Sequence, residues 1–151
     1  MTLWVVKLGT SLLRGDTAAT IEGYASGVAA AMRRGDQVVL VTSGAVGLGC
    51  QKLQLSKRPD TVVALQAAAA TGQGYLMALY ERAMAVHGLS VAQVLLTRSD
   101  LADRRRYQNA SGTLQQLLAW GVLPVINEND ALSSAELRFG DNDTLSALVA
   151  T

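Results

Sequence analysis

The sequence has very little cysteine and histidine, with one of each, Cys50 and His87, among 151 residues. A single cysteine excludes a disulfide within the chain and a metal site built from several thiolates. His87 directly precedes Gly88 at the end of a predicted helix, where an imidazole interacts favourably with the last carbonyl groups. It has no second histidine or cysteine partner for catalysis, so we do not expect either residue to be catalytic.

Long apolar runs and an excess of charge of one sign are also missing. Thirteen basic and twelve acidic residues give a net charge of +1, which offers no electrostatic reason for a nucleic-acid or membrane partner. No uninterrupted apolar run approaches the roughly 20 residues that span a bilayer. Lys7 also comes too early for the apolar core of a signal peptide. We therefore expect a cytoplasmic protein that binds neither nucleic acid nor membrane.

What the sequence does have is apolar content, with half of its residues hydrophobic, and a length that suits one domain with a real core. Short apolar runs without polar alternation are typical of strands buried on both faces. Four such runs are Leu3–Leu8, Gln37–Val41, Ser90–Leu96 and Val122–Ile126. Helical segments between them are Thr17–Arg34, Asp60–His87 and Arg105–Trp120. This alternation predicts an α/β fold with a doubly wound, mainly parallel sheet.

Ligands of open α/β sheets bind outside the carboxyl ends of the strands, and the first such end here carries Lys7. An unpaired ammonium is costly to desolvate in an otherwise apolar strand, so Lys7 calls for a role. Gly9 allows a sharp turn, and the N–H groups after it could hold an oxyanion. Lys7 would then act as a point charge on a transferring phosphoryl group. The alternative is a strand-end lysine that reaches solvent.

The second predicted strand ends in a glycine-rich loop with Gly44, Gly47 and Gly49. Three glycines in six residues indicate a backbone cradle for an anion that leads into a helix. The spacing Gly-x-x-Gly-x-Gly fits neither the dinucleotide fingerprint nor the Walker sequence. A tight strand-to-helix turn without any ligand is the alternative.

Acidic and amide side chains are concentrated near the end of the chain, where five of its twelve acidic residues lie between positions 128 and 143. Such clusters hold an ammonium group, a metal ion, or the lysine of a phosphoryl site. They also cap helices, and for Asp141 both interpretations stay open. Asp130 and Asp143 are the better functional candidates because they complement Lys7 and the glycine loop. We predict a hairpin over 131–139 and a helix over 145–151.

Two further features allow more than one interpretation. Arg104, Arg105 and Arg106 begin a helix, an unusual place for cations. We expect a solvated face there, with pairing to an acidic neighbour or to a subunit as the alternative. Gly72 and Gly74 interrupt an alanine-rich helix, which indicates close backbone packing, conceivably across a dimer.

Several of these elements together resemble the glutamate 5-kinases of the amino acid kinase superfamily. The elements are Val5–Ser11, Val41–Ala45, Leu95–Arg98, Pro124–Asp130 and Gly140–Asp143. The first two are shared loosely with aspartokinases and acetylglutamate kinases, whereas the last two are much more specific. The resemblance implies a three-layer αβα sandwich with a mainly parallel sheet, apparently truncated. Residues 1–151 would be the amino-terminal, glutamate-binding part of one kinase domain, without its nucleotide-binding part.

The resemblance also implies roles for particular residues. Lys7 would stabilise charge on the transferring phosphoryl group, and Lys7, Gly9 and Thr10 would contact the nucleotide. Asp143 would orient the catalytic lysine, and no base is needed because a carboxylate nucleophile is already ionised at neutral pH. The residues implied to bind the substrate are Ser43, Gly44 and Ala45 for one carboxylate, Asp130 for the α-ammonium group, and Asn142 for a further polar contact.

The implied reaction is the ATP-dependent, Mg²⁺-assisted phosphorylation of the side-chain carboxylate of L-glutamate, the first step of proline biosynthesis. We expect no metal ligand in this part of the chain. Proline is implied as a feedback inhibitor at or beside the glutamate site, with the 131–139 hairpin as a gate, and a homo-oligomer is expected. Two alternatives stay open: another amino acid kinase such as an acetylglutamate kinase, and a non-catalytic module that binds glutamate or proline.

Overall fold

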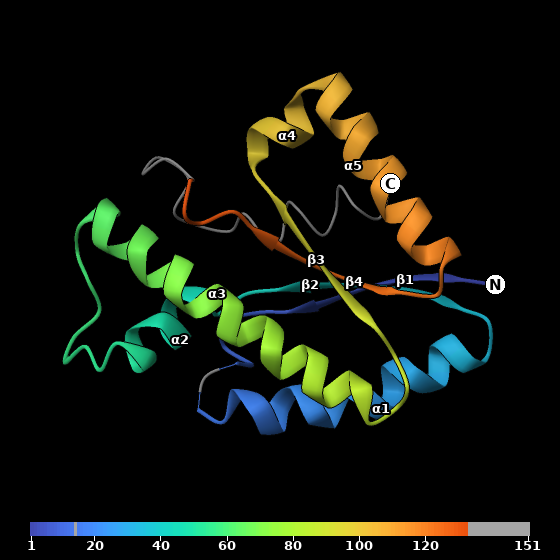
Figure 1. The fold of residues 1–151 in the computed structure, drawn as a ribbon, viewed down its shortest axis with the longest axis horizontal. Helices are drawn as coiled ribbons and strands as arrows, with labels where there is room; N and C mark the ends of the chain where they lie inside the picture. The colour runs from blue at the N-terminus through green and yellow to red at the C-terminus, as the bar shows by residue number, and fades with distance from the viewer. Residues whose placement is uncertain (14, 133–151) are drawn as a thin grey trace.

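A computed structural model describes residues 1–13 and 15–132 (Figure 1). The predicted hairpin over 131–139, apart from its first two residues, and the predicted helix over 145–151 lie outside the described residues. In chain order the described elements are β1 (Leu3–Leu8), α1 (Thr17–Arg33), β2 (Gln37–Thr42), α2 (Ala45–Lys52), α3 (Val62–Ala85), β3 (Val91–Leu96), α4 (Arg98–Ala102), α5 (Arg104–Ala119) and β4 (Leu123–Glu128).

The described strands form one parallel sheet in the order β1-β2-β4-β3. All four carboxyl ends therefore lie at the same edge, and β2 and β4 are the two central strands. The four predicted strands are confirmed, with bounds that differ by at most two residues. A parallel sheet with covered faces explains why their sequences are continuously apolar.

Helices cover both faces of the sheet and make three layers, as expected (Figure 1). The strand residues alternate between the two sides, because successive side chains of a strand point to opposite faces. Val38, Leu40 and Val125 pack against α1 and α3, whereas Val39, Val41 and Ile126 pack against α5. The αβα sandwich is confirmed for the described part of the chain.

The helix boundaries follow from side-chain caps. Asp16 caps α1 by accepting a hydrogen bond from the amide of Ala19 at 2.9 Å. The prediction that α3 begins at Asp60 was wrong by two residues. Thr61 is the cap there, since its hydroxyl accepts from the amide of Ala64 at 3.4 Å. The helix α4 was not predicted; it has five residues, too few for an apolar periodicity to be visible.

The helices α2 and α3 cross with their backbones in contact. A Cβ built at Gly72 of α3 would overlap the carbonyl oxygen of Ala45 in α2, and one built at Gly49 of α2 would overlap the carbonyl oxygen of Ala68 in α3. The predicted close packing at Gly72 is confirmed, but it lies within one chain rather than across a dimer. At Gly74 nothing in the described part of the chain lies within 4 Å of a built Cβ, so the packing predicted there does not occur within the chain, and packing across a dimer stays a prediction.

Among the described residues, α3 is also the one helix that is long and apolar enough to cross a membrane, judged by length and composition alone. The core helix of a soluble protein has the same composition. Nine residues of α3 are buried, and several of them belong to the hydrophobic core between the sheet and α1. This packing accounts for the apolar residues on the buried side of α3.

Candidate functional site

Three loops meet at the carboxyl edge of the sheet, because β1, β2 and β4 are neighbours there. They are the turn after Leu8, the loop after Thr42 and the loop after Glu128. These are the positions from which the sequence predicted a site. The fold brings seven of the predicted site residues to this edge: Lys7, Gly9, Thr10, Ser43, Gly44, Ala45 and Asp130. The predicted residues Asn142 and Asp143 lie outside the described part of the chain.

Lys7 is half-buried near the end of β1, and its side chain reaches over the turn that follows the strand. A Cβ built at Gly9 would lie 3.5 Å from the Lys7 ammonium nitrogen. The Gly9 carbonyl accepts hydrogen bonds from the amides of Leu12 and Leu13, at 3.0 and 3.3 Å, which closes the turn. The Lys7 ammonium group therefore lies over the glycine that begins this turn.

The loop after β2 places a helix amino terminus at the same edge. Gly44 has φ +99°, a left-handed conformation that costs glycine little, and it precedes the first residue of α2. Gly44 is the N-cap residue and has no side chain that could make a cap hydrogen bond. The first N–H groups of α2 and the partial positive charge of the helix end therefore suit an anion beside Ser43. The predicted strand-to-helix turn is confirmed, whereas its use as an anion cradle stays a prediction.

Leu13 joins the turn after β1 to this loop. It is buried, and a Cβ built at Gly44 would lie 3.5 Å from its Cδ1 atom. Its carbonyl oxygen also accepts a hydrogen bond from the Thr17 hydroxyl at 2.8 Å, at the start of α1. The ammonium of Lys7 and the helix end at Gly44 thus belong to one packed unit.

Near its carboxyl end β4 carries a buried amide, Asn127, which is 1% exposed. Its Nδ2 donates to Gln73 Oε1 at 2.9 Å, and its Oδ1 accepts from the amide of Glu128 at 2.9 Å. The amide of Asn129 donates to the Leu96 carbonyl at 2.8 Å and ties the loop to the end of β3. These bonds hold the half-buried Asp130 at the edge that carries Ser43.

Sequence reasoning missed a second buried polar contact, between Thr42 at the end of β2 and Tyr80 of α3. Their hydroxyl oxygens are 2.6 Å apart, and both residues are 0% exposed. Burial raises the pKa of the Tyr80 hydroxyl to about 12, against a smaller opposing effect of the Thr42 hydrogen bond, so it is protonated at neutral pH. The sequence signal that could have indicated these contacts is a pair of polar residues, Gln73 and Tyr80, seven positions apart on an otherwise apolar helix.

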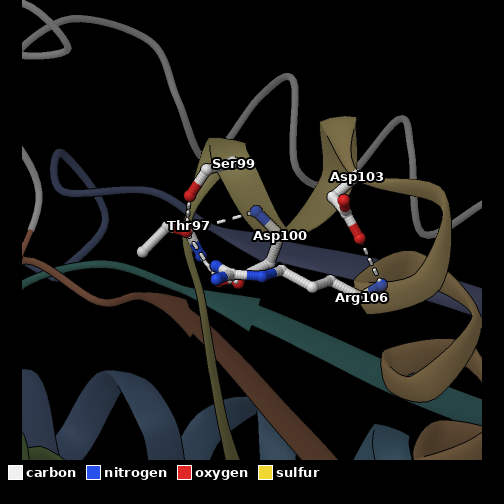
Figure 2. A network of polar contacts seen from close by, with 5 residues as sticks. All are labelled: Thr97, Ser99, Asp100, Asp103 and Arg106. Carbon is white, nitrogen blue, oxygen red and sulfur yellow. Dashed lines mark hydrogen bonds and ion pairs between the residues drawn. The ribbon is translucent and has the colours of Figure 1, made fainter.

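A third set of polar contacts follows β3, where Thr97 is the N-cap of α4 (Figure 2). The Thr97 hydroxyl and amide donate to Asp100 at 2.6 and 2.7 Å, and Arg106 forms an ion pair with Asp100 at 3.1 Å. Asp103 caps α5 by accepting from the Arg106 amide at 2.8 Å. The Arg106 side chain is exposed, as expected for a solvated face, and it also pairs with an acidic neighbour, which was the alternative.

Asp100 is the N3 residue of the capping box of α4, whose N-cap is Thr97. We expect Asp100→Ala to lower the free energy of unfolding by about 1 kcal/mol at pH 7, the usual size of a capping interaction. Hydrogen bonds from the Thr97 side chain and backbone, ahead of the Arg106 ion pair, lower the pKa of the Asp100 carboxyl. Because its pKa is lower in the folded state, the Asp100 carboxylate stabilises that state fully at pH values above its unfolded pKa of about 3.9. This stabilisation is lost as the pH falls through the folded pKa. In urea unfolding, the difference in free energy of unfolding between the parent and Asp100→Ala should therefore become smaller as the pH falls from 7 to 2.5. Asp60→Ala, at an exposed position, is the control. A difference between the parent and Asp100→Ala that does not depend on pH would contradict the role of the Asp100 carboxylate.

Among residues 1–13 and 15–132, no group of three histidine, cysteine, aspartate or glutamate side chains is placed to hold a metal ion. The edge instead offers a cation, an amino-terminal helix end and a carboxylate on three adjacent strands. Residues 2–151 match the sequence model of the amino acid kinase family. The chain belongs to the amino acid kinase family.

Curated relatives of this family member are closely similar but longer. It is 97% identical over 150 residues to the glutamate 5-kinase of Synechococcus sp. (strain CC9902), covering 99% of the chain and 42% of that relative. It is 70% identical over 155 residues to the glutamate 5-kinase of Prochlorococcus marinus (strain MIT 9313), covering 100% of the chain and 43% of that relative. The chain thus spans about two fifths of the length of these relatives.

Two solved kinase structures share the fold of this chain. Giardia carbamate kinase gives a TM-score of 0.56 at 20% identity, over 83% of this chain and 57% of that one. Aspartate kinase from Synechocystis gives a TM-score of 0.57 at 17% identity, over 98% of this chain and 26% of that one. At these identities the likeness extends to the fold alone.

Proposed function

We propose that residues 1–151 are the glutamate-binding, amino-terminal part of a cytoplasmic glutamate 5-kinase, which phosphorylates the side-chain carboxylate of L-glutamate in the first step of proline biosynthesis. The observation that carries this proposal is the meeting of Lys7, the helix end at Gly44 and the Asp130 carboxylate at one sheet edge. The 97% identity to a glutamate 5-kinase across the chain supports it. The nucleotide-binding part would lie in the further length of the relatives.

The charges of the edge match those of glutamate, which has two carboxylates and one ammonium group. The Ser43 hydroxyl and the N–H groups of Gly44 and Ala45 would hold one carboxylate, because a helix amino terminus favours negative charge. Asp130 would hold the α-ammonium group as a charge-assisted hydrogen-bond acceptor. Asn142 would add a polar contact. Proline would compete at or beside this site, and the enzyme would be a homo-oligomer.

Lys7 would serve the phosphoryl group that is transferred. A phosphate oxygen would bind the Lys7 ammonium group, which lies over the turn at Gly9. Thr10 and the backbone of the turn would contribute further contacts, and Asp143 would orient the lysine. Bound ATP with Mg²⁺ would supply the phosphoryl group, with phosphate oxygens providing most contacts to the metal. A carboxylate oxygen is ionised at neutral pH and needs no base for its attack, so the role of this chain is positioning and charge stabilisation.

A substrate comparison tests the proposal, since N-acetylglutamate has no α-ammonium group for Asp130 to bind. We expect the full-length enzyme to prefer glutamate by at least about 100-fold in kcat/KM, the discrimination typical of an unpaired buried polar group. Coupled ADP release with each substrate measures this ratio. Preference for N-acetylglutamate would favour an acetylglutamate kinase, and glutamate binding by calorimetry without turnover would favour a non-catalytic module.

Asp130→Asn isolates the ammonium contact. We expect the KM for glutamate to rise about 30-fold, since losing a charged hydrogen-bond partner costs about 2 kcal/mol. The KM for ATP should stay within twofold of the parent value. Glu81→Gln, an exposed substitution on α3, is the matched control for the loss of one negative charge. An unchanged KM for glutamate would remove Asp130 from the site.

A further inference from the structure

The helix α3 reaches the site through two polar side chains, Gln73 and Tyr80. They are seven residues apart, which is close to two helical turns, so they lie on the same side of the helix. Each bonds to a buried polar residue at the end of a central strand: Gln73 to Asn127 of β4 and Tyr80 to Thr42 of β2. One rigid element therefore contacts the ends of both strands that carry proposed substrate-binding loops.

The two strand residues lie side by side. Leu40 and Val125 are register partners and face α3, so Thr42 and Asn127, two residues further along, face the same helix. The helix α3 begins on the side of the carboxyl ends of the strands (Figure 1). Helical side chains lean toward the helix amino terminus, which aims Gln73 and Tyr80 toward that edge.

The contact of Tyr80 reaches the peptide that begins the glycine loop. The Thr42 hydroxyl donates to the carbonyl oxygen of Ser43 at 3.2 Å. The Tyr80 hydroxyl lies 2.6 Å from the Thr42 hydroxyl and holds it in place, and either oxygen can be the donor of that hydrogen bond. The Ser43 carbonyl and the Gly44 N–H belong to one planar peptide, so fixing the carbonyl also fixes the direction of the N–H group.

The contact of Gln73 works in the same way on the other loop. Gln73 Oε1 accepts from Asn127 Nδ2, and Gln73 Nε2 donates to Gln93 Oε1 at 2.9 Å on β3. This arrangement leaves Asn127 Oδ1 directed at the amide of Glu128. It thereby sets the orientation of the last peptide of β4, from which the loop continues to Asp130.

We propose that Gln73 and Tyr80 are positioning residues of the glutamate site, which orient the Gly44 N–H group and the Asp130 loop through Thr42 and Asn127. The inference rests on the proposed function, because it names those two loops as the ones that bind glutamate. Both residues act through others and touch neither substrate nor nucleotide. Their removal therefore affects the affinity for glutamate rather than the transfer step.

Kinetics of the full-length enzyme test this proposal with Tyr80→Phe and Gln73→Met, which remove the hydrogen-bonding groups and retain most of the side-chain volume. We expect each to raise the KM for glutamate about five- to thirtyfold, with kcat within threefold and the KM for ATP within twofold of the parent values. Tyr75→Phe is the matched control, since Tyr75 lies on the same helix with an exposed side chain. Assays are run below the melting temperature of every variant.

A second set of variants separates positioning from stability. Thr42→Ser keeps the hydroxyl and should leave the KM for glutamate within twofold of the parent value, whereas Thr42→Val should raise it. Because Tyr80 acts through Thr42, adding Tyr80→Phe to Thr42→Val should raise the KM no further. Adding Gln73→Met should raise it again, since that residue acts on the other loop.

The outcomes are distinct. A parent enzyme that does not phosphorylate glutamate overturns the proposed function and this inference with it. An active parent whose Tyr80→Phe and Gln73→Met variants keep the parental KM overturns the inference alone, even if their melting temperatures fall. A multiplicative effect of Tyr80→Phe in the Thr42→Val background also overturns it.

Discussion

Replacing Lys7 by alanine in the full-length enzyme should lower kcat about 1000-fold, the upper range for removing one preorganised charge or donor at a reacting centre. The KM for glutamate should change by less than about threefold, because an interaction made in the transition state affects kcat rather than ground-state binding. The expectation follows from the position of the ammonium beside Gly9, at the edge that carries the glycine loop.

Steady-state rates of ADP release at saturating ATP and varied glutamate measure both constants. Lys52→Ala is the matched control, because Lys52 is exposed and ends α2 at the opposite end from Gly44. Lys7→Arg keeps the charge but changes its shape and reach, so we expect an intermediate kcat. If kcat is unchanged in Lys7→Ala, the lysine has no part in the transition state and the proposed phosphoryl contact is wrong.

The strands and most helices could be predicted from the sequence because their physical causes are local. A strand covered on both faces is mostly apolar, and the central strands β2 and β4 are buried over five of their six residues. The parallel arrangement follows from the helices between them. Lys7 and the glycine loop were recognised because a cation and three glycines are unusual at the ends of such strands. Asp130 was recognised by its cluster and by its resemblance to a known family.

The contacts that hold the site depend on tertiary structure and leave little trace in the sequence. Thr42 and Tyr80 are 38 residues apart, and Gln73 and Asn127 are 54 residues apart. Their pairing is decided by where α3 crosses the sheet, which no local pattern encodes. The ion pair between Asp100 and Arg106 likewise required the unpredicted helix α4, whose capping box sets the approach of α5.

The crossing of α2 and α3 makes Gly72 the position with the largest expected effect on stability. Gly72→Ala should lower the free energy of unfolding of the full-length protein by about 3 kcal/mol, the upper range for overpacking a close contact. The added Cβ would overlap the Ala45 carbonyl oxygen and lie 2.5 Å from the Gly49 amide nitrogen. These are backbone atoms, so they cannot rotate away, and the two helices must move apart.

Gly74→Ala is the matched control, because it adds the same methyl group to the same helix two residues away. Nothing lies within 4 Å of a Cβ at Gly74, so this substitution should stabilise by about 1 kcal/mol through helix propensity alone. Thermal unfolding of the two variants beside the parent should therefore show shifts of opposite sign. Two shifts of the same sign would contradict the close crossing of α2 and α3.

The Gly72 substitution also reaches the site, since Ala45 is the first residue of α2 and directly follows Gly44. Displacing the start of α2 would move the N–H groups proposed to bind a glutamate carboxylate. We therefore expect the KM for glutamate to rise in Gly72→Ala, measured below its melting temperature, and to stay at the parent value in Gly74→Ala. A destabilised Gly72→Ala variant with an unchanged KM would show that α3 supports the fold at this crossing without positioning the glycine loop.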